Sequence, residues 1–291
     1  MHIGGQEMWL FEKRQERRKA EDKTTGFTIN FALKPLCAIV PWGGKHKSLS
    51  WFGMTDSELW ICVGEQTIYE YSDAARAYWN CNIRYNDYQL SRFLEDFSEI
   101  FDTIRESIPE KYYNMIENFW DMRDSWKELH INDDDDIFDT FYDEELEPLG
   151  QWFSDRVFDS GHLIGGPLIG CFRCGEKIKV WWLGDDVLEN GENIWTSTGG
   201  VYELAYTDFI AEVNRFFNEF YKSMDEQVRH AVERNWREVE VDKKRLAEEN
   251  KERRDGFDQK LALLSEDCRK TDWKKVDALF EKMEKELSTG N

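Results

Sequence analysis

The stretch PLIGCFRCGEKIKVWW, residues 167–182, decides the fold class of this chain. Two apolar runs flank the pair Gly175-Glu176, a pattern typical of two antiparallel strands joined by a tight turn. Because successive side chains of a strand point to opposite faces, we expect Trp181 and Trp182 on opposite sides of the sheet. We therefore predict a β-hairpin with its tip at Gly175-Glu176.

A second β region lies nearer the N-terminus. In FTINFALKPL, residues 27–36, the apolar residues at the start alternate with others, which is the period of a half-buried strand. The segment 49–72 then alternates short apolar runs with turn residues and predicts an antiparallel meander. The further strands predicted from these patterns are 50–54, 59–63, 67–71, 194–198 and 201–206, with turns at 55–58 and 64–65.

Helical spacing of apolar residues occupies the rest of the chain. It predicts a helix over 85–108, with Asp87 as the N-cap and Pro109 at its end. After Pro167 the chain has no proline, and helices are predicted from residue 208 almost to the C-terminus. We therefore predict an α+β fold: a mixed or antiparallel sheet from two β-hairpin regions, packed with helices and followed by a long C-terminal helical extension.

The two β regions show a weak internal similarity. Each has a Gly-Glu pair near a hairpin tip, at residues 64–65 and 175–176. Each is followed by a helix with an Arg-Phe-x-x-acid-Phe stripe, RFLEDF at 92–97 and RFFNEF at 215–220. A duplicated hairpin-plus-helix unit would explain the similarity, and chance likeness of two amphipathic helices is the alternative.

Charge and composition divide the chain into three parts. Residues 1–26 are predicted to be a charged N-terminal arm, 27–225 the α+β domain, and 226–291 a C-terminal helical hairpin. In the hairpin, a last helix would pack its apolar seam on the preceding helix; the same spacing also suits a homodimer. The seam is Trp273, Val276, Phe280, Met283 and Leu287, and the predicted cis partners are Phe257, Leu261 and Leu264.

The charge of the chain restricts its partners. The 291 residues contain 59 Asp and Glu against 38 Lys and Arg, which leaves a formal net charge of −21. Phosphate backbones and anionic membranes attract clustered Lys and Arg, so we expect no nucleic-acid partner and no membrane partner. No apolar run reaches the length of a membrane span, and residues 8–11 are too short for a signal peptide. The six cysteines form no disulfide pattern, which favours a cytoplasmic location.

The acidic tract at residues 131–160 is the sharpest charge feature, with 11 acids and one arginine. An EF-hand calcium loop requires glycine at its sixth position, where this tract has Ile137, so the standard loop is excluded. Apolar residues between the acids would supply the anchors that a protein-binding surface needs, whereas a solvated loop or weak divalent-cation binding are the alternatives. The residues predicted to bind a basic protein partner are Asp133, Asp134, Asp135, Asp136, Phe138, Asp139, Phe141 and Tyr142.

A tryptophan-lined pocket between the two β regions is the second candidate site. The glycines around His162 in the loop 160–166 would allow close approach of a ligand, so this loop is the predicted gate. Core packing of the tryptophans and turn-capping by Asp56 are the alternatives. The residues predicted to line this pocket are Trp51, Asp56, Trp60, His162, Trp181 and Trp195.

Motifs for catalysis and metal binding are absent from the sequence. Cys171 and Cys174 form a single C-x-x-C pair in a predicted strand, where residues three apart face opposite sides, and zinc needs four ligands. The sequence has no nucleophile elbow, no phosphate loop and no dinucleotide-binding glycine motif. We therefore predict no catalytic residue, no metal and no cofactor.

Four segments carry a resemblance to a known family. They are LKPLCAIVPWG at 33–43, LSWFGMTD at 49–56, GPLIGCFRCGEKIKVWW at 166–182 and TDWKKVDALF at 271–280. Together they resemble an uncharacterised bacterial family known only as a domain of unknown function. The resemblance covers residues 27–287 and implies a soluble bacterial protein of the cytosol with no known catalytic residue. In composition the chain is also similar to immunity proteins of toxin systems and accessory proteins of anti-phage defence.

These observations favour an acidic protein-interaction module, in an immunity or defence setting, that binds a basic protein partner. Two alternatives stay open. The first is a small-molecule-binding or hydrolytic enzyme domain that uses the tryptophan-lined pocket. The second is a structural subunit that self-associates through its C-terminal helices.

Overall fold

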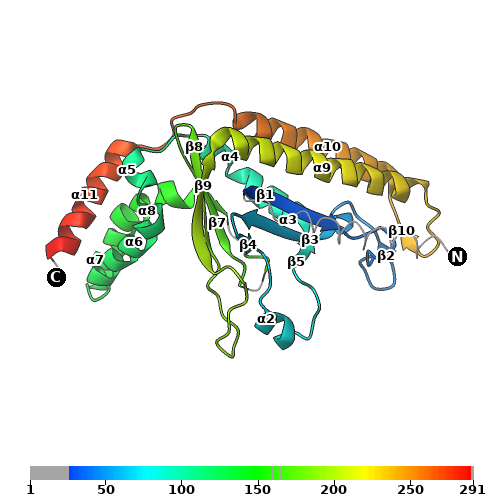
Figure 1. The fold of residues 1–291 in the computed structure, drawn as a ribbon, viewed down its shortest axis with the longest axis horizontal. Helices are drawn as coiled ribbons and strands as arrows, with labels where there is room; N and C mark the ends of the chain where they lie inside the picture. The colour runs from blue at the N-terminus through cyan, green and yellow to red at the C-terminus, as the bar shows by residue number, and fades with distance from the viewer. Residues whose placement is uncertain (1–25, 159, 164, 290–291) are drawn as a thin grey trace.

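The computed structural model describes residues 26–158, 160–163 and 165–289 (Figure 1). Antiparallel sheets packed with helices make up the fold, so the predicted α+β class is confirmed. The strands form two separate main sheets, not one mixed sheet, together with a short parallel pair. The predicted N-terminal arm, residues 1–26, lies outside the described residues except for Gly26.

The first sheet is built around strand β3. Strand β1 pairs with β3 along its whole length, from Phe27 opposite Val63 to Leu33 opposite Ser57. Strands β5 and β4 pair with the beginning and the end of β3. The alternation predicted for β1 is confirmed over its first five residues, where Phe27, Ile29 and Phe31 are buried and the residues between them are half-buried. The strands are β1 (Phe27–Leu33), β3 (Asp56–Val63), β4 (Gln66–Ile68) and β5 (Asn86–Gln89).

Two predictions just before β3 are wrong. Residues 50–54 form a turn and the 3₁₀ helix η1 (Gly53–Thr55), not a strand. The Ser50 hydroxyl accepts a hydrogen bond from the Gly53 amide at 3.1 Å, and such local side-chain bonds compete with strand pairing. Most of the predicted turn at 55–58 is instead the start of β3, which pairs there with β1 and β5.

The second sheet has the strand order β6-β7-β8-β9, and all its pairs are antiparallel. The predicted hairpin is confirmed, with Cys174 paired to Lys177 across the Gly175-Glu176 turn. The last strand starts at Gly199 and pairs with β8, so the predicted strand at 194–198 is wrong. The strands are β6 (Val157–Phe158), β7 (Leu168–Cys174), β8 (Lys177–Leu183) and β9 (Gly199–Ala205).

Helices cover both sheets and extend beyond them on each side in Figure 1. Asp87 lies in β5, and the helix predicted from residue 85 begins instead at Leu90. None of the described helices has both the length and the hydropathy that crossing a bilayer requires. The remaining elements are β2 (Lys47–Ser48), α2 (Asp73–Tyr78), α3 (Leu90–Glu99), α4 (Phe101–Ile104), α5 (Glu110–Tyr113), α6 (Ile116–His130), α7 (Asp135–Phe141), the π-helical turn η2 (Tyr142–Leu146), α8 (Glu147–Ser154), α9 (Tyr206–Glu233), β10 (Val239–Glu240), α10 (Lys243–Leu263) and α11 (Trp273–Thr289).

Two hydrophobic cores meet at the second sheet. The first core joins one face of this sheet to the first sheet, α3 and α9, with Trp182 among its members. The second core joins the other face to α5, α6, α8 and α11, and Phe153 packs there on Phe172 and Trp181 at ring-centroid distances of 4.6 and 5.3 Å. The prediction that Trp181 and Trp182 face opposite sides is therefore confirmed.

The predicted C-terminal hairpin has to be corrected. The long helix α9 runs through the predicted boundary at 225–226 and pairs with α10, as Figure 1 shows along the top of the molecule. The last helix, α11, packs on α6 and α8 instead. Phe257 and Leu264 belong to the first core, whereas the seam residues Val276, Phe280 and Met283 are buried in the second. The seam considered for a homodimer is thus covered within one chain.

The two β regions share their turns but not their strand order. Gly64 and Gly175 each start a two-residue turn with a φ of 59° and 58°, a conformation that glycine adopts without strain. The strand before the following helix differs, because β5 pairs with the first strand of its hairpin and β9 with the second. A duplication stays a prediction, with the two units differing in their pairing.

Candidate functional site

The acidic tract forms an exposed end of the second core, which we call the acidic tip (residues 129–144). It comprises the end of α6, the following loop, α7 and the start of the π-helical turn, at the lower left of Figure 1. Six of its carboxylates are exposed and have no ion pair in the described part of the chain. They are Asp134, Asp135, Asp136, Asp139, Asp143 and Glu144.

Large apolar side chains are exposed among these acids. Ile131 and Ile137 are 52% and 56% exposed, Leu129 is 44% and Tyr142 is 37% exposed. Half of the exposed large hydrophobic residues of the described chain thus belong to the acidic tip. Grouped exposed apolar side chains are less usual on a protein surface than scattered ones, which makes the acidic tip the candidate interaction surface.

Two of the predicted partner-binding residues, Phe138 and Phe141, are not exposed in the structure. Phe141 is 5% exposed and stacks on His130 with ring centroids 3.9 Å apart, so it belongs to the second core. Phe138 is half-buried against the same core. Helix α7 turns one face inward, and at helical spacing this face contains 138 and 141 while Ile137 points outward.

His130 holds the acidic tip to the last helix. Its Nδ1 lies 2.9 Å from the Asp133 carboxylate and its Nε2 lies 3.1 Å from Glu286 of α11. The Trp126 indole donates to the same Glu286 oxygen at 2.7 Å. Burial lowers the pKa of His130, but hydrogen bonds to the two carboxylates outweigh burial, so the pKa lies above its ordinary value. The loop at 131–134 therefore has a fixed anchor under its exposed acids.

The residues predicted to line a tryptophan pocket do not converge. Trp51 and Trp195 are buried in the first core, and their indole nitrogens donate to Asn250 at 2.9 Å and to the Gly165 carbonyl at 2.6 Å. Trp181 belongs to the second core. Trp60 lies in a small separate cluster and stacks on Tyr85 at 4.4 Å.

The two polar members of the predicted pocket have structural partners. Asp56 accepts a hydrogen bond from the Lys34 ammonium at 2.9 Å. His162 lies 3.7 Å from the Asp96 carboxylate and packs its ring on Tyr88 with centroids 4.7 Å apart. Neither contact links the two residues to the tryptophans, so the predicted pocket is replaced by core packing.

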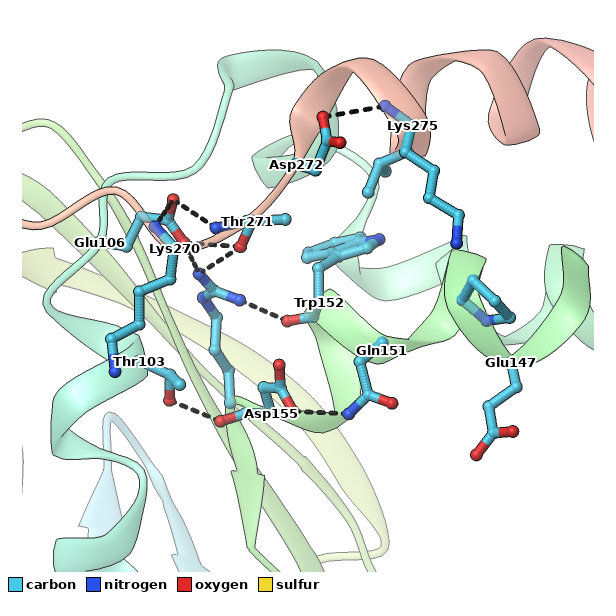
Figure 2. Close-up of a pocket in the computed structure, with 13 residues that line it drawn as sticks. Thr103, Glu106, Glu147, Gln151, Trp152, Asp155, Lys270, Thr271, Asp272 and Lys275 are labelled. Atoms are coloured by element: carbon cyan, nitrogen blue, oxygen red, sulfur yellow. Dashed lines mark hydrogen bonds and ion pairs between the residues drawn. The ribbon is translucent and has the colours of Figure 1, made fainter. Parts of the chain in front are cut away.

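A cavity of about 450 Å³ lies elsewhere, between α8, the segment after α4 and the start of α11 (Figure 2). Its volume falls within the range of roughly 300–1,000 Å³ that is usual for small-molecule sites. We call it the α8–α11 cavity. Its lining residues are Thr103, Glu106, Glu147, Pro148, Gln151, Trp152, Asp155, Arg156, Lys270, Thr271, Asp272, Lys275 and Val276.

A buried ion pair forms the inner wall of this cavity. Arg156 donates to the Glu106 carboxylate at 2.6 Å, and the side chains are 1% and 2% exposed. The Lys270 and Thr271 amides donate to Glu106 at 3.0 and 3.1 Å, and the Thr271 hydroxyl donates at 2.6 Å. Burial raises the pKa of Glu106, but these hydrogen bonds outweigh burial and hold it below its ordinary value. The pair therefore fixes the segment that leads into α11.

Sequence reasoning missed the α8–α11 cavity because its walls come from three distant segments. Glu106, Arg156 and Thr271 share no spacing or motif that would bring them together. One signal was available: Arg156 is the single arginine of the acidic tract and comes three residues after the apolar pair Trp152-Phe153 of α8. An isolated cation in such a place predicts a buried partner, although not which one.

The cysteine pair behaves as the strand geometry predicts. Cys171 is buried in the first core and burial raises the pKa of its thiol, whereas Cys174 packs on the side of the second core. Within the described residues no three His, Cys, Asp or Glu side chains are grouped as metal ligands would be.

One family comparison matches this chain. The sequence model of a family of unknown function, DUF5984, matches residues 28–279, so the chain belongs to that family. The resemblance to an uncharacterised family is thereby confirmed. No curated protein and no solved structure gives a significant match.

Proposed function

We propose that this member of the DUF5984 family is a protein-interaction module that binds a basic protein partner through the acidic tip. The observation that carries the proposal is the grouping of Leu129, Ile131, Ile137 and Tyr142 among six carboxylates that have no ion pair in the described residues. An acidic loop that is only solvated has no need of such apolar groups. Interfaces combine both, because charge guides the partner and apolar anchors bind it.

Binding would proceed in two steps. The unpaired carboxylates of the acidic tip attract a basic surface over a distance of about 8–10 Å in physiological salt, which raises the association rate. Ile137 and Tyr142 are then buried by the partner, which lowers the dissociation rate. Since His130 holds the loop to α11, the backbone of the loop is already ordered before binding, and little conformational entropy is lost when the partner binds.

The π-helical turn supports a role for this region. Residues 142–146 widen the helix directly after α7, and single π-turns inside helices are frequent at functional sites. The widened turn begins with the exposed Tyr142 and ends with the buried Leu146. It therefore presents Tyr142 and the neighbouring acids outward while the chain remains attached to the second core.

An immunity or defence setting belongs to the same proposal. A bacterial cytoplasmic protein that neutralises a basic toxin would need an acidic, preformed binding surface of this kind. The net charge of −21 supports such a partner, because it opposes binding to other acidic proteins and to nucleic acid.

The test uses a triple variant of the acidic tip, Asp134→Lys/Asp135→Lys/Asp136→Lys. Its matched control, Asp185→Lys/Glu226→Lys/Glu238→Lys, changes the net charge equally at exposed acids elsewhere. Random peptides displayed on phage are selected on the wild-type protein. We expect selected peptides that are rich in Lys, Arg and large apolar residues. Their association with the tip variant should slow by about tenfold or more, while the control keeps most of its association rate.

Two further arms complete this test. Ile137→Ala and Tyr142→Ala should each raise the dissociation rate of a selected peptide, with a loss of about 1–2 kcal/mol in binding free energy. Capture from host lysate with the wild-type protein, the tip variant and the control then identifies the native partner. Peptides or partners that bind the tip variant as well as the wild type would refute the assignment. Association of the chain with itself in sedimentation would instead favour a self-associating subunit.

A further inference from the structure

The α8–α11 cavity contains buried hydrogen-bond donors without acceptors. Within the described residues, the indole nitrogen of Trp152 and the Nε of Arg156 have no hydrogen-bond partner, and both residues are 1% exposed. Buried donors are nearly always paired, so two of them in the lining of one cavity call for an explanation. An acceptor supplied by a ligand would satisfy the Trp152 indole.

The acceptors of the inner wall are already engaged. Glu106 accepts hydrogen bonds from Arg156, from Lys270 and Thr271, and from the Trp273 indole at 3.3 Å. It therefore has no free lone pair directed at Trp152. Among the buried side-chain nitrogen and oxygen atoms of the lining, the two without any partner in the described residues are thus both donors.

Two other carboxylates of the cavity lining, Asp155 and Asp272, also have hydrogen-bond partners. Asp155 accepts from the Gln151 amide at 2.6 Å, and Asp272 accepts from the Lys275 backbone amide at 3.3 Å. Both bonds are drawn in Figure 2, where the carboxylate of Glu147 points away from Trp152. None of these three carboxylates reaches the Trp152 nitrogen, which has no hydrogen-bond partner in the part of the chain that the structure describes.

A cation lines the same cavity as the unpartnered indole. Figure 2 shows the nitrogen edge of Trp152 turned toward the side chain of Lys275. Lys275 is exposed, and its ammonium has no ion pair within the described residues. The Lys270 ammonium, by contrast, pairs with Asp102. An anionic oxygen placed near Trp152 could accept from the indole and pair with Lys275 at once.

We propose that the α8–α11 cavity binds a small carboxylic acid, with the carboxylate held by the Trp152 indole N–H and the Lys275 ammonium. Lys275 is exposed, so its ammonium is open to a ligand from solvent, and the ligand reaches the buried indole N–H by displacing side chains of the lining. Pro148 and Val276 supply apolar contacts for the rest of the ligand. A neutral ligand would leave Lys275 unpaired, which is why an acid is favoured. The site is separate from the acidic tip and does not depend on the function proposed there.

The test follows the Trp152 indole resonance by nuclear magnetic resonance of the full chain labelled with ¹⁵N. The Trp152→Phe variant identifies the resonance by its loss, because phenylalanine keeps an aromatic ring but has no N–H. Succinate and inorganic phosphate are titrated separately to about 20 mM at constant ionic strength, which detects a Kd in the millimolar range. We expect succinate to shift the resonance downfield and to saturate.

Variants of Lys275 and of the neighbouring Lys274 separate specific succinate binding from general salt effects. Lys275→Gln should weaken succinate binding about tenfold, whereas the neighbouring exposed Lys274→Gln should not change it. The tip variant should bind succinate like the wild type. If Trp152→Phe does not fold, the proposal is tested by the rise of Tm that succinate causes in the two lysine variants. This rise should be smaller for Lys275→Gln than for Lys274→Gln.

Three results would overturn the proposal. A Trp152 resonance that stays unchanged with both probes would show that no oxyanion reaches the indole. A saturating shift with phosphate alone would replace the carboxylate with a phosphate ligand. Equal succinate binding by the wild type and Lys275→Gln would remove Lys275 from the site.

Discussion

Arg156 and Asp136 lie in the same acidic tract, yet their environments are opposite. Arg156 is 1% exposed and pairs with Glu106, which accepts four further hydrogen bonds. Asp136 is exposed, has no ion pair in the described residues and lies among exposed isoleucines. Buried charges are expensive unless paired, so the first arrangement stabilises the fold. Exposed unpaired charges cost little, which leaves the second free to meet a partner.

The largest effect is expected where the buried pair is broken. Glu106→Gln removes the charge that compensates Arg156 and weakens the hydrogen bonds that hold the segment before α11. We expect the free energy of unfolding to fall by about 3–5 kcal/mol, measured by urea denaturation. Asp134→Asn, the control in the acidic tip, should leave it unchanged. Equal stability of the two variants would show that the buried pair does not hold α11.

A smaller contrast lies within α7 itself. Phe141 packs on His130 and on Trp126 at 4.9 Å, so Phe141→Ala should cost about 3 kcal/mol by leaving a cavity in the second core. Ile137→Ala changes an exposed side chain and should alter stability by no more than about 0.5 kcal/mol. Thermal unfolding of both variants checks the difference. A costly Ile137→Ala would mean that the apolar surface of the acidic tip is part of the core.

The attachment of the acidic tip to α11 through His130 and Glu286 should depend on pH. The pKa of His130 is raised above 6.5, so its ion pairs contribute stability that is fully present below that value and lost as the pH rises through the folded-state pKa. The Glu286 pKa is lowered below 4.5, because hydrogen bonds from Trp126 and His130 outweigh burial, and its contribution is lost as the pH falls through its folded-state value.

The comparison of wild type and His130→Gln across pH measures this link. The difference in unfolding free energy should be largest near pH 6 and should shrink toward pH 9, as His130 loses its proton in both states. His46→Gln, at an exposed histidine in a loop, serves as the control. A difference that stays constant with pH would show that packing on Phe141, and not the charge of His130, stabilises the acidic tip.

The smallest effect on stability is expected from the tip variant used above. Reversing Asp134, Asp135 and Asp136 removes no ion pair that the described residues make, so the free energy of unfolding should change by less than about 0.5 kcal/mol per site. The same variant is expected to show the largest loss of association rate. A strong change of stability, seen in urea titrations, would mean that the tip charges serve the fold.

Local patterns predicted the secondary structure best where one rule acted alone. The hairpin at 168–183 follows from its glycine turn, and the burial of Phe27, Ile29 and Phe31 in β1 follows from their alternation. The prediction was wrong at 50–54, where an apolar run bends into a turn through its own serine. It was also wrong for the packing of α11, because an apolar seam at helical spacing says that a helix is covered but not by what.

The candidate sites were harder to predict from local sequence patterns than the secondary structure was. The acidic tract was visible as charge, but which of its apolar residues point outward depends on how α7 lies on the second core. Phe141 and Ile137 look equivalent in the sequence and are opposite in the structure. The α8–α11 cavity was not predicted, since its donors and acceptors come from residues more than 40 positions apart.

The sequence by itself determined the α+β class, the two glycine turns, the two-faced strand at Trp181 and Trp182, and the acidic character of the chain. Each of these depends on neighbouring residues, through backbone conformation, side-chain period or charge. Only the tertiary structure decided that α9 pairs with α10, that α11 closes the second core, and that Arg156 meets Glu106. These contacts join residues far apart in the chain, where burial and hydrogen bonding select one partner among many that local patterns allow.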